Sequence, residues 1–413
     1  MIFRSDLHLH SPYSRATSPA CTPAGIAQAA RIKGIQVIAT GDCIHPVWLS
    51  LLDEHLEPAE PGLFSLKKPY AKESMQYLPS VGTQSPVRFM LSTEISLIYK
   101  HDGATRKVHH LIYLPTIAAA RRLQSVLASR GNIHSDGRPI LGMSSHELLS
   151  LVLEVSSEAV LIPAHGWTPW FSLFGSRSGY DRLEDCFGDL SDQIFAIETG
   201  LSADPDMIRR ISALDHLALL SNSDCHSLAM VAREATVYDT EQSYNGIMQA
   251  LRANDRQTLL GTIEFFPEEG KYHHDGHRDC GVCLSPQESL AVHNRCPVCS
   301  KPLTLGVLHR INSMADRELP VYPTNAPDQQ HTVPLREILS GLLSVGVSSK
   351  KVSTYYEQAL RCLGAELDIL LTLPICTIGD FDQKLARHIE AIRSNNVLRE
   401  AGFDGQFGRI TIS

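Results

Sequence analysis

Two histidines lie one residue apart near the start of the chain, in the stretch Asp6-Leu7-His8-Leu9-His10-Ser11. They follow a β-like opening at residues 1–5. Because side chains on a strand repeat every second residue, His8 and His10 can point the same way and offer two imidazoles to one metal ion. Asp6 has the same parity, and it could bind the metal or orient a ring from behind. The alternative is a polar strand end with two uninvolved histidines.

Acidic and imidazole side chains recur where further strands are predicted to end. Segments with helix signals, such as 24–33 behind Thr22-Pro23, alternate with short apolar strands such as 35–39. This alternation predicts βαβ units, and in such folds the functional side chains gather at the carboxyl ends of the strands. Residues 54–86 show little periodicity and are interpreted as a long loop or a small insertion. The side chains expected at the rim, besides His8 and His10, are Asp42, His45, Glu94, His110, His165, Glu198, Asp224 and His226.

An aromatic stretch, Gly166-Trp167-Thr168-Pro169-Trp170-Phe171, directly follows His165. One interpretation is a platform on which a base or another ring stacks, with Glu198 contacting the substrate from the same rim. The other is a hydrophobic loop packed under the barrel, which is the more common role of such residues.

Two CxxC pairs, Cys280-Gly281-Val282-Cys283 and Cys296-Pro297-Val298-Cys299, follow a polar segment at 267–278. Their spacing predicts a tetrahedral zinc ribbon, and a four-cysteine site is closed, so its zinc is structural. The alternative is a pair of redox-active dithiols. The expected zinc ligands are Cys280, Cys283, Cys296 and Cys299.

The C-terminal part is predicted to be mainly helical, with helices at 334–344, 349–363 and 381–394 before a glycine-rich tail at 399–410. Basic side chains here and around the cysteines could meet phosphates, or they could simply be solvated. These residues are Arg278, Arg295, Lys301, Lys350, Lys351, Arg387 and Arg393. Three domains are expected: a catalytic barrel (1–266), a zinc ribbon with its preceding linker (267–310) and a helical domain that contacts DNA (311–413).

The composition is that of a globular protein, with 43% hydrophobic and 20% charged residues among 413. The formal net charge of −8 provides no overall basic field, so any contact with nucleic acid needs a local basic patch. No apolar run is long enough to span a membrane, and Arg4, Asp6 and His8 interrupt any signal-peptide core. We therefore expect a cytoplasmic protein without membrane contact, whose cysteine pairs bind metal.

The order of Asp6-Leu7-His8-Leu9-His10-Ser11, Glu94, His110, His165 and Ser223-Asp224-Cys225-His226 resembles the motifs of the PHP (polymerase and histidinol phosphatase) superfamily. The resemblance covers residues 1–266 and implies a distorted (β/α)7 barrel that holds two or three divalent metals. Asp42 stands where many members have a histidine, His45 is a further candidate, and His109 remains an alternative to His110. The resemblance makes these residues metal ligands: His8, His10, Glu94, His110, His165, Asp224 and His226.

The whole order of barrel, cysteine pairs and helical tail, the last containing Gly402-Phe403-Asp404-Gly405-Gln406-Phe407-Gly408, resembles the endonuclease Q family. The resemblance implies a DNA repair endonuclease that cuts on the 5′ side of a deaminated base (hypoxanthine, uracil, xanthine) or an abasic site, leaving a 3′-hydroxyl and a 5′-phosphate. The target base would be flipped out of the duplex. Expected catalytic residues are Asp224, His226 and Glu94.

The expected cofactors are Zn²⁺, at the histidine-rich rim and in the ribbon, and Mg²⁺ or Mn²⁺ for catalysis. The expected partner is lesion-containing DNA, with a replication or repair protein as a further candidate. Two other functions remain open: a small-molecule phosphoesterase similar to histidinol phosphatase, and a non-catalytic, metal-stabilised interaction module. The first leaves the ribbon and tail unexplained. The sequence contains no GxxxxGK[ST] phosphate loop, which argues against an ATP-driven motor.

Overall fold

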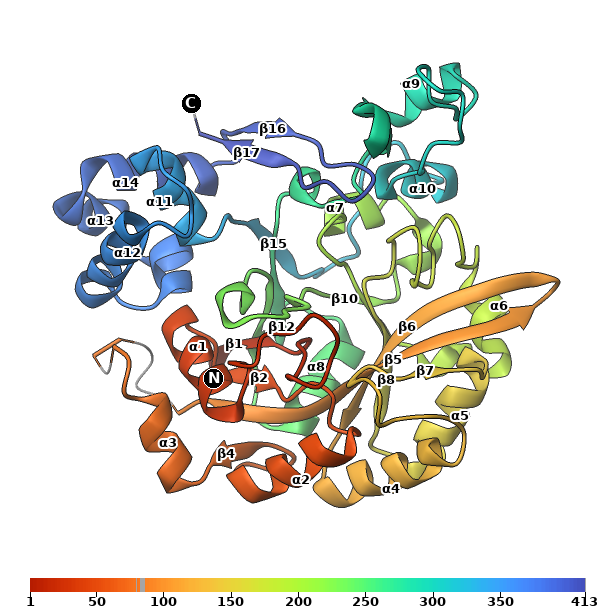
Figure 1. Ribbon diagram of the computed structural model, residues 1–413, viewed down its shortest axis with the longest axis horizontal. Helices are drawn as coiled ribbons and strands as arrows, with labels where there is room; N and C mark the ends of the chain where they lie inside the picture. Colours follow the sequence, from red (N-terminus) through yellow and green to blue (C-terminus); the bar gives the residue numbers. More distant parts are fainter. Residues whose placement is uncertain (79, 82–85, 413) are drawn as a thin grey trace.

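The computed structural model describes residues 1–78, 80–81 and 86–412. Figure 1 shows a barrel from which two modules rise, one at the upper right around α9 (Pro286–Ala291) and α10 (Val307–Met314). The other, at the upper left, contains α11 (Leu335–Leu343), α12 (Lys350–Leu363), α13 (Ile375–Phe381) and α14 (Gln383–Arg393). A hairpin of β16 (Leu398–Glu400) and β17 (Arg409–Thr411) lies between the two modules.

Seven strands of the described chain form the barrel. β1, β2 and β5 pair in parallel, β6 is antiparallel to both β5 and β8, and β9 is parallel to β10. A hydrogen bond from the Gly166 N–H to the Glu198 carbonyl joins the ends of β8 and β9, and a bridge between Leu9 and Cys225 connects the end of β10 to the end of β1, which closes the ring. The predicted distorted (β/α)7 barrel is therefore confirmed. Its strands are β1 (Ile2–Asp6), β2 (Val37–Ala39), β5 (Arg88–His101), β6 (Ala104–Leu114), β8 (Val160–Pro163), β9 (Ala196–Glu198) and β10 (Ala218–Leu220).

Local sequence signals explain where the elements begin and end. The Thr22 hydroxyl accepts from the Gly25 N–H at 3.1 Å, Pro23 opens α1, and Gly34 ends it with a left-handed φ of 89°. All three residues of β2 are fully buried, as expected for a strand covered on both faces. The helices around the barrel are α1 (Pro23–Lys33), α2 (Pro46–His55), α4 (Ile117–Ala128), α5 (Ser145–Val155), α6 (Leu183–Phe187), α7 (Pro205–Ile208) and α8 (Tyr244–Ala253).

The remaining strands extend the sheet beyond the ring. The predicted insertion at 54–86 forms β3 (Leu56–Pro58), β4 (Phe64–Leu66) and α3 (Lys68–Ser74), and β4 pairs with β5; residues 79 and 82–85 lie outside the described residues. β7 (Ile140–Leu141) also pairs with β5. β11 (Ala235–Asp239) is antiparallel to β1 and to β12 (Leu259–Glu264). No helix in the described part of the chain is long and apolar enough to cross a membrane.

The modules are tied to the barrel by backbone pairing and by buried charge. β15 (Asp328–His331), from the linker before the helices, pairs in parallel with β12 of the barrel. Lys33 of α1 forms a 2.7 Å ion pair with Glu366, and both side chains are almost fully buried. Backbone pairing thus crosses the domain boundaries predicted at 266/267 and 310/311.

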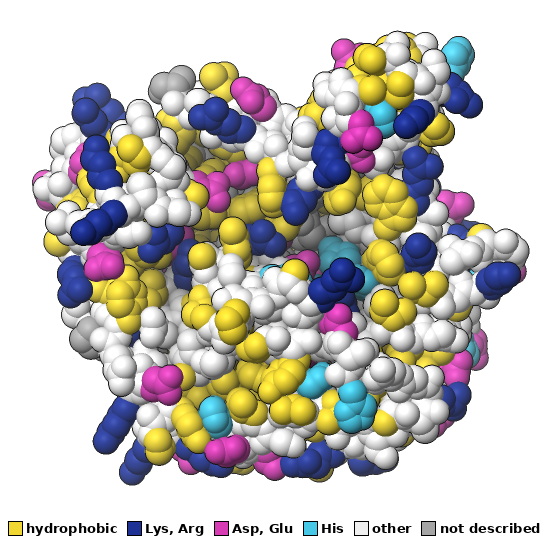
Figure 2. All heavy atoms as spheres, viewed as in Figure 1, with side chains coloured by type: hydrophobic (Ala, Val, Ile, Leu, Met, Phe, Trp, Pro, Cys, Tyr) yellow, Lys and Arg dark blue, Asp and Glu magenta, His cyan; other side chains and the backbone are white. Residues whose placement is uncertain are grey.

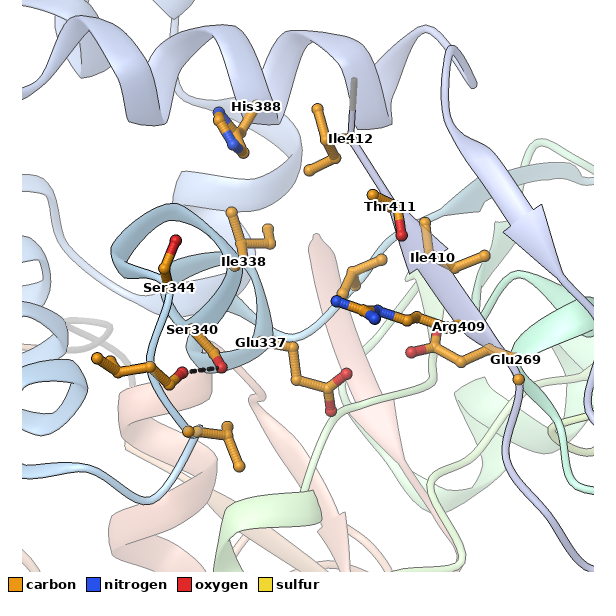
Figure 3. Close-up of a pocket in the computed structure, with 16 residues that line it drawn as sticks. Glu269, Glu337, Ile338, Ser340, Ser344, His388, Arg409, Ile410, Thr411 and Ile412 are labelled. Carbon is orange, nitrogen blue, oxygen red and sulfur yellow. Dashed lines mark hydrogen bonds between the residues drawn. The ribbon is translucent and has the colours of Figure 1, made fainter.

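A cavity of about 720 Å³ separates α11 and α14 from β17 (Figure 3). Its lining is mostly apolar but includes the carboxyl groups of Glu269, in a turn at Pro267–Glu269, and of Glu337 on α11. Burial, and then the neighbouring Glu337 carboxyl, raise the pKa of Glu269, while Arg233 opposes the shift. The pKa of Glu337 is also raised by burial. The folded protein therefore holds a proton here that the unfolded chain releases at lower pH.

We expect Glu269→Gln to flatten the pH dependence of stability between pH 5 and 9. In the wild type the raised pKa gives stability that is present below the unfolded pKa and is lost as pH rises toward the folded value. One such proton changes the free energy of unfolding by up to about 1.4 kcal/mol per pH unit. Melting temperatures across this range measure it, with the exposed Glu57→Gln as control. Parallel curves for Glu269→Gln and wild type would contradict the assignment.

Candidate metal centre

The ends of β1 and β10 lie side by side, and this brings together two D-x-H segments from opposite ends of the barrel sequence. The His10 N–H donates to the Cys225 carbonyl at 3.1 Å, next to the Leu9–Cys225 bridge. His10 Nε2 lies 3.2 Å from Asp224 Oδ1. Two segments more than 200 residues apart therefore form one face of the site, as the sequence predicts.

Glu94 is the central side chain of the site. Its carboxylate is only 1% exposed and comes from β5, in the middle of the barrel wall. It lies 2.7 Å from His109 Nδ1, 3.1 Å from His165 Nε2, 3.2 Å from His10 Nε2 and 3.6 Å from His8 Nε2. One carboxylate thus contacts imidazoles from three other strands.

Two overlapping groups of side chains could each hold a cation. In each group one ligand atom per residue lies within 4.8 Å of the others, and Glu94 belongs to both. The buried His8 Nε2 has no hydrogen-bond partner among the described residues, as expected of a nitrogen that binds a metal. Imidazole with carboxylate suits zinc, manganese or iron. The first group is His8, His10, Glu94 and Asp224, and the second is Glu94, His109 and His165.

The charges of the site compensate for its burial. Burial by itself raises the pKa of Glu94, but positive charge in its surroundings, including that of Arg138, outweighs it and holds that pKa well below its usual value. For His8, burial lowers the pKa, yet Glu198 and Asp224 raise it well above 6.5. Burial lowers the pKa of His109 to about 4 despite Glu94, so this imidazole is neutral and can bind a metal at pH 7.

Asp42 and Glu198 hold the histidine rings from behind. Asp42 Oδ1 lies 3.1 Å from His10 Nδ1, and its other oxygen accepts from the N–H and hydroxyl of Ser11. Glu198 lies 3.0 Å from His8 Nδ1 and accepts from the His165 N–H at 2.7 Å. Such partners fix the tautomer and the ring orientation. The structure therefore departs from one expectation, because Asp42 lies outside both ligand groups. Glu198 lines the pocket beside the site, although it is 1% exposed and its carboxylate is hydrogen-bonded within the protein.

His45 and Asp6 have local structural contacts. His45 caps α2 by accepting from the Trp48 N–H, and its ring stacks on Tyr13 at 4.5 Å. The capping position explains its place just before Pro46, so its prediction as a metal ligand is corrected. Asp6 accepts from the N–H groups of Ser223 and Ala232 at 3.0 and 2.9 Å, which fixes the loop that carries Asp224.

The structure distinguishes His109 from His110. These neighbours lie on β6 and face opposite sides of the sheet, because successive strand residues alternate. His109 contacts Glu94, whereas His110 Nε2 is 2.8 Å from the Ser145 hydroxyl and its ring packs on Phe187. The alternative left open by the sequence, His109, is the one that faces the site.

His226 borders the site without belonging to either group. Its ring centroid is 4.4 Å from that of His10, and its side chain is 32% exposed. Burial, and then the nearby His10, lower its pKa, so it is neutral at pH 7.

Three site residues hold a backbone conformation that disfavours L side chains. Asp42, His165 and Asp224 have φ of 45°, 27° and 45°. Each follows the end of a barrel strand by two to four residues. Left-handed non-glycine residues cost about 1–3 kcal/mol and persist where the surroundings fix them. The strain turns these side chains from the strand direction onto the rim.

A pocket of about 600 Å³ opens beside the cation groups. Figure 2 shows histidine side chains at the bottom of a hollow between the two modules, with Lys and Arg side chains around it. Trp170 and Phe171 line the pocket as predicted, but Trp167 is 1% exposed and stacks on Phe174. The prediction of Trp167 as a stacking residue is therefore wrong, and its alternative, a packed hydrophobic residue, is correct.

Sequence reasoning did not assign several side chains of this pocket, among them one near Glu94 and three from beyond the barrel. Arg138, in the loop before β7, places Nη1 3.0 Å from Glu94 Oε2 and so brings a positive charge to the cations' surroundings. Lys271, Tyr272 and Phe407 come from segments beyond the barrel. No motif marked Lys271 or Tyr272, and the glycine-rich motif that contains Phe407 did not place it at the pocket, since only the fold brings the linker and the tail to the barrel rim.

The cysteine module differs from the predicted four-cysteine ribbon. The ligand atoms that converge within 4.8 Å are those of His277, Cys280, Cys296 and Cys299. Burial raises the pKa of Cys296, but the N–H groups of Cys299 and Val298 outweigh it and lower that pKa to about 7, which favours the thiolate that zinc binds.

Strand pairing explains why Cys283 is replaced by His277. β13 (Asp275–His277) and β14 (Val282–Leu284) are antiparallel, with His277 opposite Val282 and Gly276 opposite Cys283. Paired residues share a face and neighbours alternate, so Cys283 points away from His277. Its sulfur lies near His274 and the Ala401 carbonyl instead.

A family model described as the MJ0043 C-terminal domain matches residues 334–396, which are the helical module. The chain is 27% identical over 272 residues to the uncharacterized protein MJ0043 of Methanocaldococcus jannaschii, covering 63% of this chain but only 33% of that protein. It is 26% identical over 390 residues to the uncharacterized protein YqxK of Bacillus subtilis, covering 93% of this chain and 91% of that one.

Two solved structures match the whole chain with a TM-score of 0.86 and 31% identity. One is the lesion-specific endonuclease PfuEndoQ from Pyrococcus furiosus, of which 96% is covered. The other, 97% covered, is endonuclease Q in complex with a 27-mer duplex substrate that carries an abasic lesion at the active site.

The seven-stranded barrel, with two cation groups sharing one carboxylate at its rim, defines a metal-binding barrel of the PHP type. The match to endonuclease Q extends over both added modules as well as the barrel. The chain belongs to the endonuclease Q family.

We expect His277→Ala to lose the tightly bound zinc of the cysteine module, while Cys283→Ser retains it. Removing one of four ligands opens the tetrahedral site, and binding of structural zinc is coupled to folding. Zinc content per chain after dialysis, with the melting temperature, measures both effects. If Cys283→Ser loses zinc and His277→Ala retains it, the ligands are the four cysteines and not His277.

We also expect His109→Ala to lose one barrel cation and His110→Ala to keep the wild-type number. His110→Ala loses only its hydrogen bond to Ser145, which lowers stability by about 1 kcal/mol. Cation stoichiometry after dialysis against Mn²⁺ distinguishes the two neighbours. Equal stoichiometry in the two variants would remove His109 from the second group.

Proposed function

We propose that this protein is a metal-dependent DNA repair endonuclease that hydrolyses the phosphodiester on the 5′ side of a deaminated base (hypoxanthine, uracil or xanthine) or an abasic site. The products are a 3′-hydroxyl and a 5′-phosphate. The observation that carries the proposal is the pair of cation groups joined by Glu94 at the bottom of an aromatic-walled pocket. Membership of the endonuclease Q family, which includes a structure with a lesion-carrying duplex, supports DNA as the substrate.

The residues of the site fit divalent cations. His8, His10, Glu94 and Asp224 would hold one, and Glu94, His109 and His165 another. The histidine-rich second group suits zinc, while the more exposed Asp224 side could take magnesium or manganese. When bound, such cations supply a water of lowered pKa and neutralise charge on the phosphate.

The protein's own side chains position the reactants and move protons. Asp224, 27% exposed, is the carboxylate that faces the pocket and orients the attacking water. Water attacks phosphorus in line and the bond to the 3′-oxygen breaks. The neutral His226 accepts the proton of the attacking water, and a solvent water protonates the 3′-oxygen, which departs on the opposite side of phosphorus. Arg138 pairs with the phosphate oxygens, for which a guanidinium is well shaped.

Recognition of the base follows from the chemistry of deamination. An exocyclic amine becomes a carbonyl oxygen, so a pocket of hydrogen-bond donors accepts the lesion and leaves a normal base poorly paired. A base inside a duplex must be flipped out to enter, at a cost of a few kcal/mol. Trp170 and Phe171 provide ring surfaces in the pocket.

Basic side chains suited to DNA phosphates gather at the pocket, although the net charge of the chain is −8. Arg138, Arg233 and Lys271 all line it. A small-molecule phosphoesterase would need neither this patch nor the two modules, and no feature of the site favours that alternative.

We expect Asp224→Asn to lower cleavage of uracil, hypoxanthine and abasic duplexes by about 100-fold or more, because it removes transition-state charge stabilisation. Melting temperature and DNA affinity should change little. Labelled duplexes with each lesion or none, in the presence of Mg²⁺ or Mn²⁺, measure the activity.

Asp102→Asn is the matched control, because this exposed aspartate has a φ of 48°, close to the 45° of Asp224. It should cut like the wild type. Near-normal cutting by Asp224→Asn would remove Asp224 from the mechanism. Release of phosphate from histidinol phosphate by the wild type, without action on lesion DNA, would favour the phosphoesterase.

A further inference from the structure

A large aromatic side chain stands exposed at the mouth of the catalytic pocket. Phe407, in the turn between β16 and β17, is 55% exposed and lines the same pocket as His109, His165 and Asp224. A phenylalanine left in water beside a charged site has no role in the core of the fold. Exposed apolar side chains in such positions mark contact with a ligand.

The turn that carries Phe407 is held rigidly. The N–H groups of Gly402 and Gly408 donate to the carbonyls of Glu268 and Glu269 at 2.7 and 3.0 Å. The N–H of Gly405 donates to the Lys271 carbonyl at 3.0 Å. Any Cβ at Gly408 would lie 2.0 Å from the Glu268 carbonyl oxygen, so this close approach requires glycine.

The tip of the turn is also fixed. Phe403 and Gln406 exchange both backbone hydrogen bonds around Asp404 and Gly405, whose φ of 43° and 87° fit a type I′ turn. Asp404 accepts from the Arg278 N–H at 2.8 Å, which anchors the turn to the cysteine module. A turn held in this way can keep the Phe407 side chain in a fixed position when a ligand packs against it.

The other aromatic residues of the pocket are arranged differently. Trp170 packs edge-to-face on Tyr272 at 6.1 Å, and Phe171 lies 4.7 Å from the His109 ring. These rings have neighbours within the protein and form walls. The described contact of the Phe407 ring is with the ammonium group of Lys271, 4.5 Å from its centroid. Lys271 therefore places a positive charge, suited to a phosphate, beside the ring.

We propose that Phe407 is a wedge that enters the base stack of duplex DNA and fills the place left by the flipped nucleotide, while Lys271 holds the adjacent phosphate. The inference rests on the proposed function and adds a residue to it. Inserted apolar side chains unstack a base step, and an aromatic ring stacks on the neighbouring bases without regard to sequence. The wedge therefore serves every lesion type and leaves the choice of base to the pocket.

A wedge is needed only where the target nucleotide is stacked and paired. We expect Phe407→Ala to lower cleavage of uracil in a full duplex by tenfold or more. Cleavage of the same uracil in a single strand, or in a one-nucleotide bulge where it is already displaced, should stay within twofold of the wild type. Phe407→Trp should restore most of the duplex activity, and Phe407→Leu part of it.

Leu398→Ala is the matched control, because Leu398 is a 62% exposed apolar residue on the same hairpin that does not line the pocket. It should cut all three substrates like the wild type. Affinities for the three DNAs, measured by fluorescence anisotropy without divalent cations, give a readout independent of chemistry, and only the full duplex should lose affinity with Phe407→Ala.

The outcomes separate this inference from the proposed function. If the wild type cuts uracil DNA and Phe407→Ala cuts the full duplex equally well, the wedge is overturned and the endonuclease stands. An equal loss on all three substrates also overturns it, because that result indicates a structural role. If the wild type neither cuts nor preferentially binds lesion DNA, the endonuclease fails and the wedge fails with it.

Discussion

A buried negative charge at Glu94 is the constraint on which the architecture depends. A carboxylate transferred from water to a protein interior loses several kcal/mol of solvation, even after relaxation, unless partners surround it. Here the partners are imidazoles on β6 and at the ends of β1 and β8, together with Arg138. His109 lies beside Glu94 in the β5–β6 hairpin, whereas the imidazoles from β1 and β8 reach it because the strands curve into a barrel. The fold can therefore be understood as the structure that satisfies this carboxylate, and a bound cation would use the same convergence.

The ring histidines are in turn oriented by buried carboxylates. Asp42 and Glu198 hold the far nitrogens of His10 and His8, and Asp6 holds the loop of Asp224. The left-handed backbone of Asp42 and Asp224 is tolerated because these hydrogen bonds fix both loops. Strain, burial and charge thus concentrate at one edge of the barrel, which is where the chemistry is proposed.

The barrel does not complete its own pocket. The turn of the β16–β17 hairpin brings Phe407 over the linker residues Lys271 and Tyr272, more than 130 positions away in the chain. The backbone carbonyls of Glu268 and Glu269 accept hydrogen bonds from the hairpin. The pairing of β15 with β12 and the Lys33–Glu366 ion pair attach the helical module to the barrel. The cysteine module is joined to the same hairpin through Asp404. The candidate metal groups at the rim and the pocket that the two modules complete are therefore parts of one structure.

The sequence by itself predicted the barrel and the helical module, because strand periodicity and helix signals are local. It also predicted that five candidate metal ligands converge, because these side chains lie on or just after barrel strands: His8, His10, Glu94, His165 and Asp224. Tertiary structure alone decided the rest. The alternation of strand faces turns His109 rather than His110, and His277 rather than Cys283, toward the candidate metal sites. His45 caps a helix and Trp167 is buried, so neither has its predicted role. Chain packing brings Arg138 and Phe407 to the pocket. Residue types and spacing state which groups can react, but the direction of a side chain depends on which strand lies beside it, and that is settled only when distant segments pack.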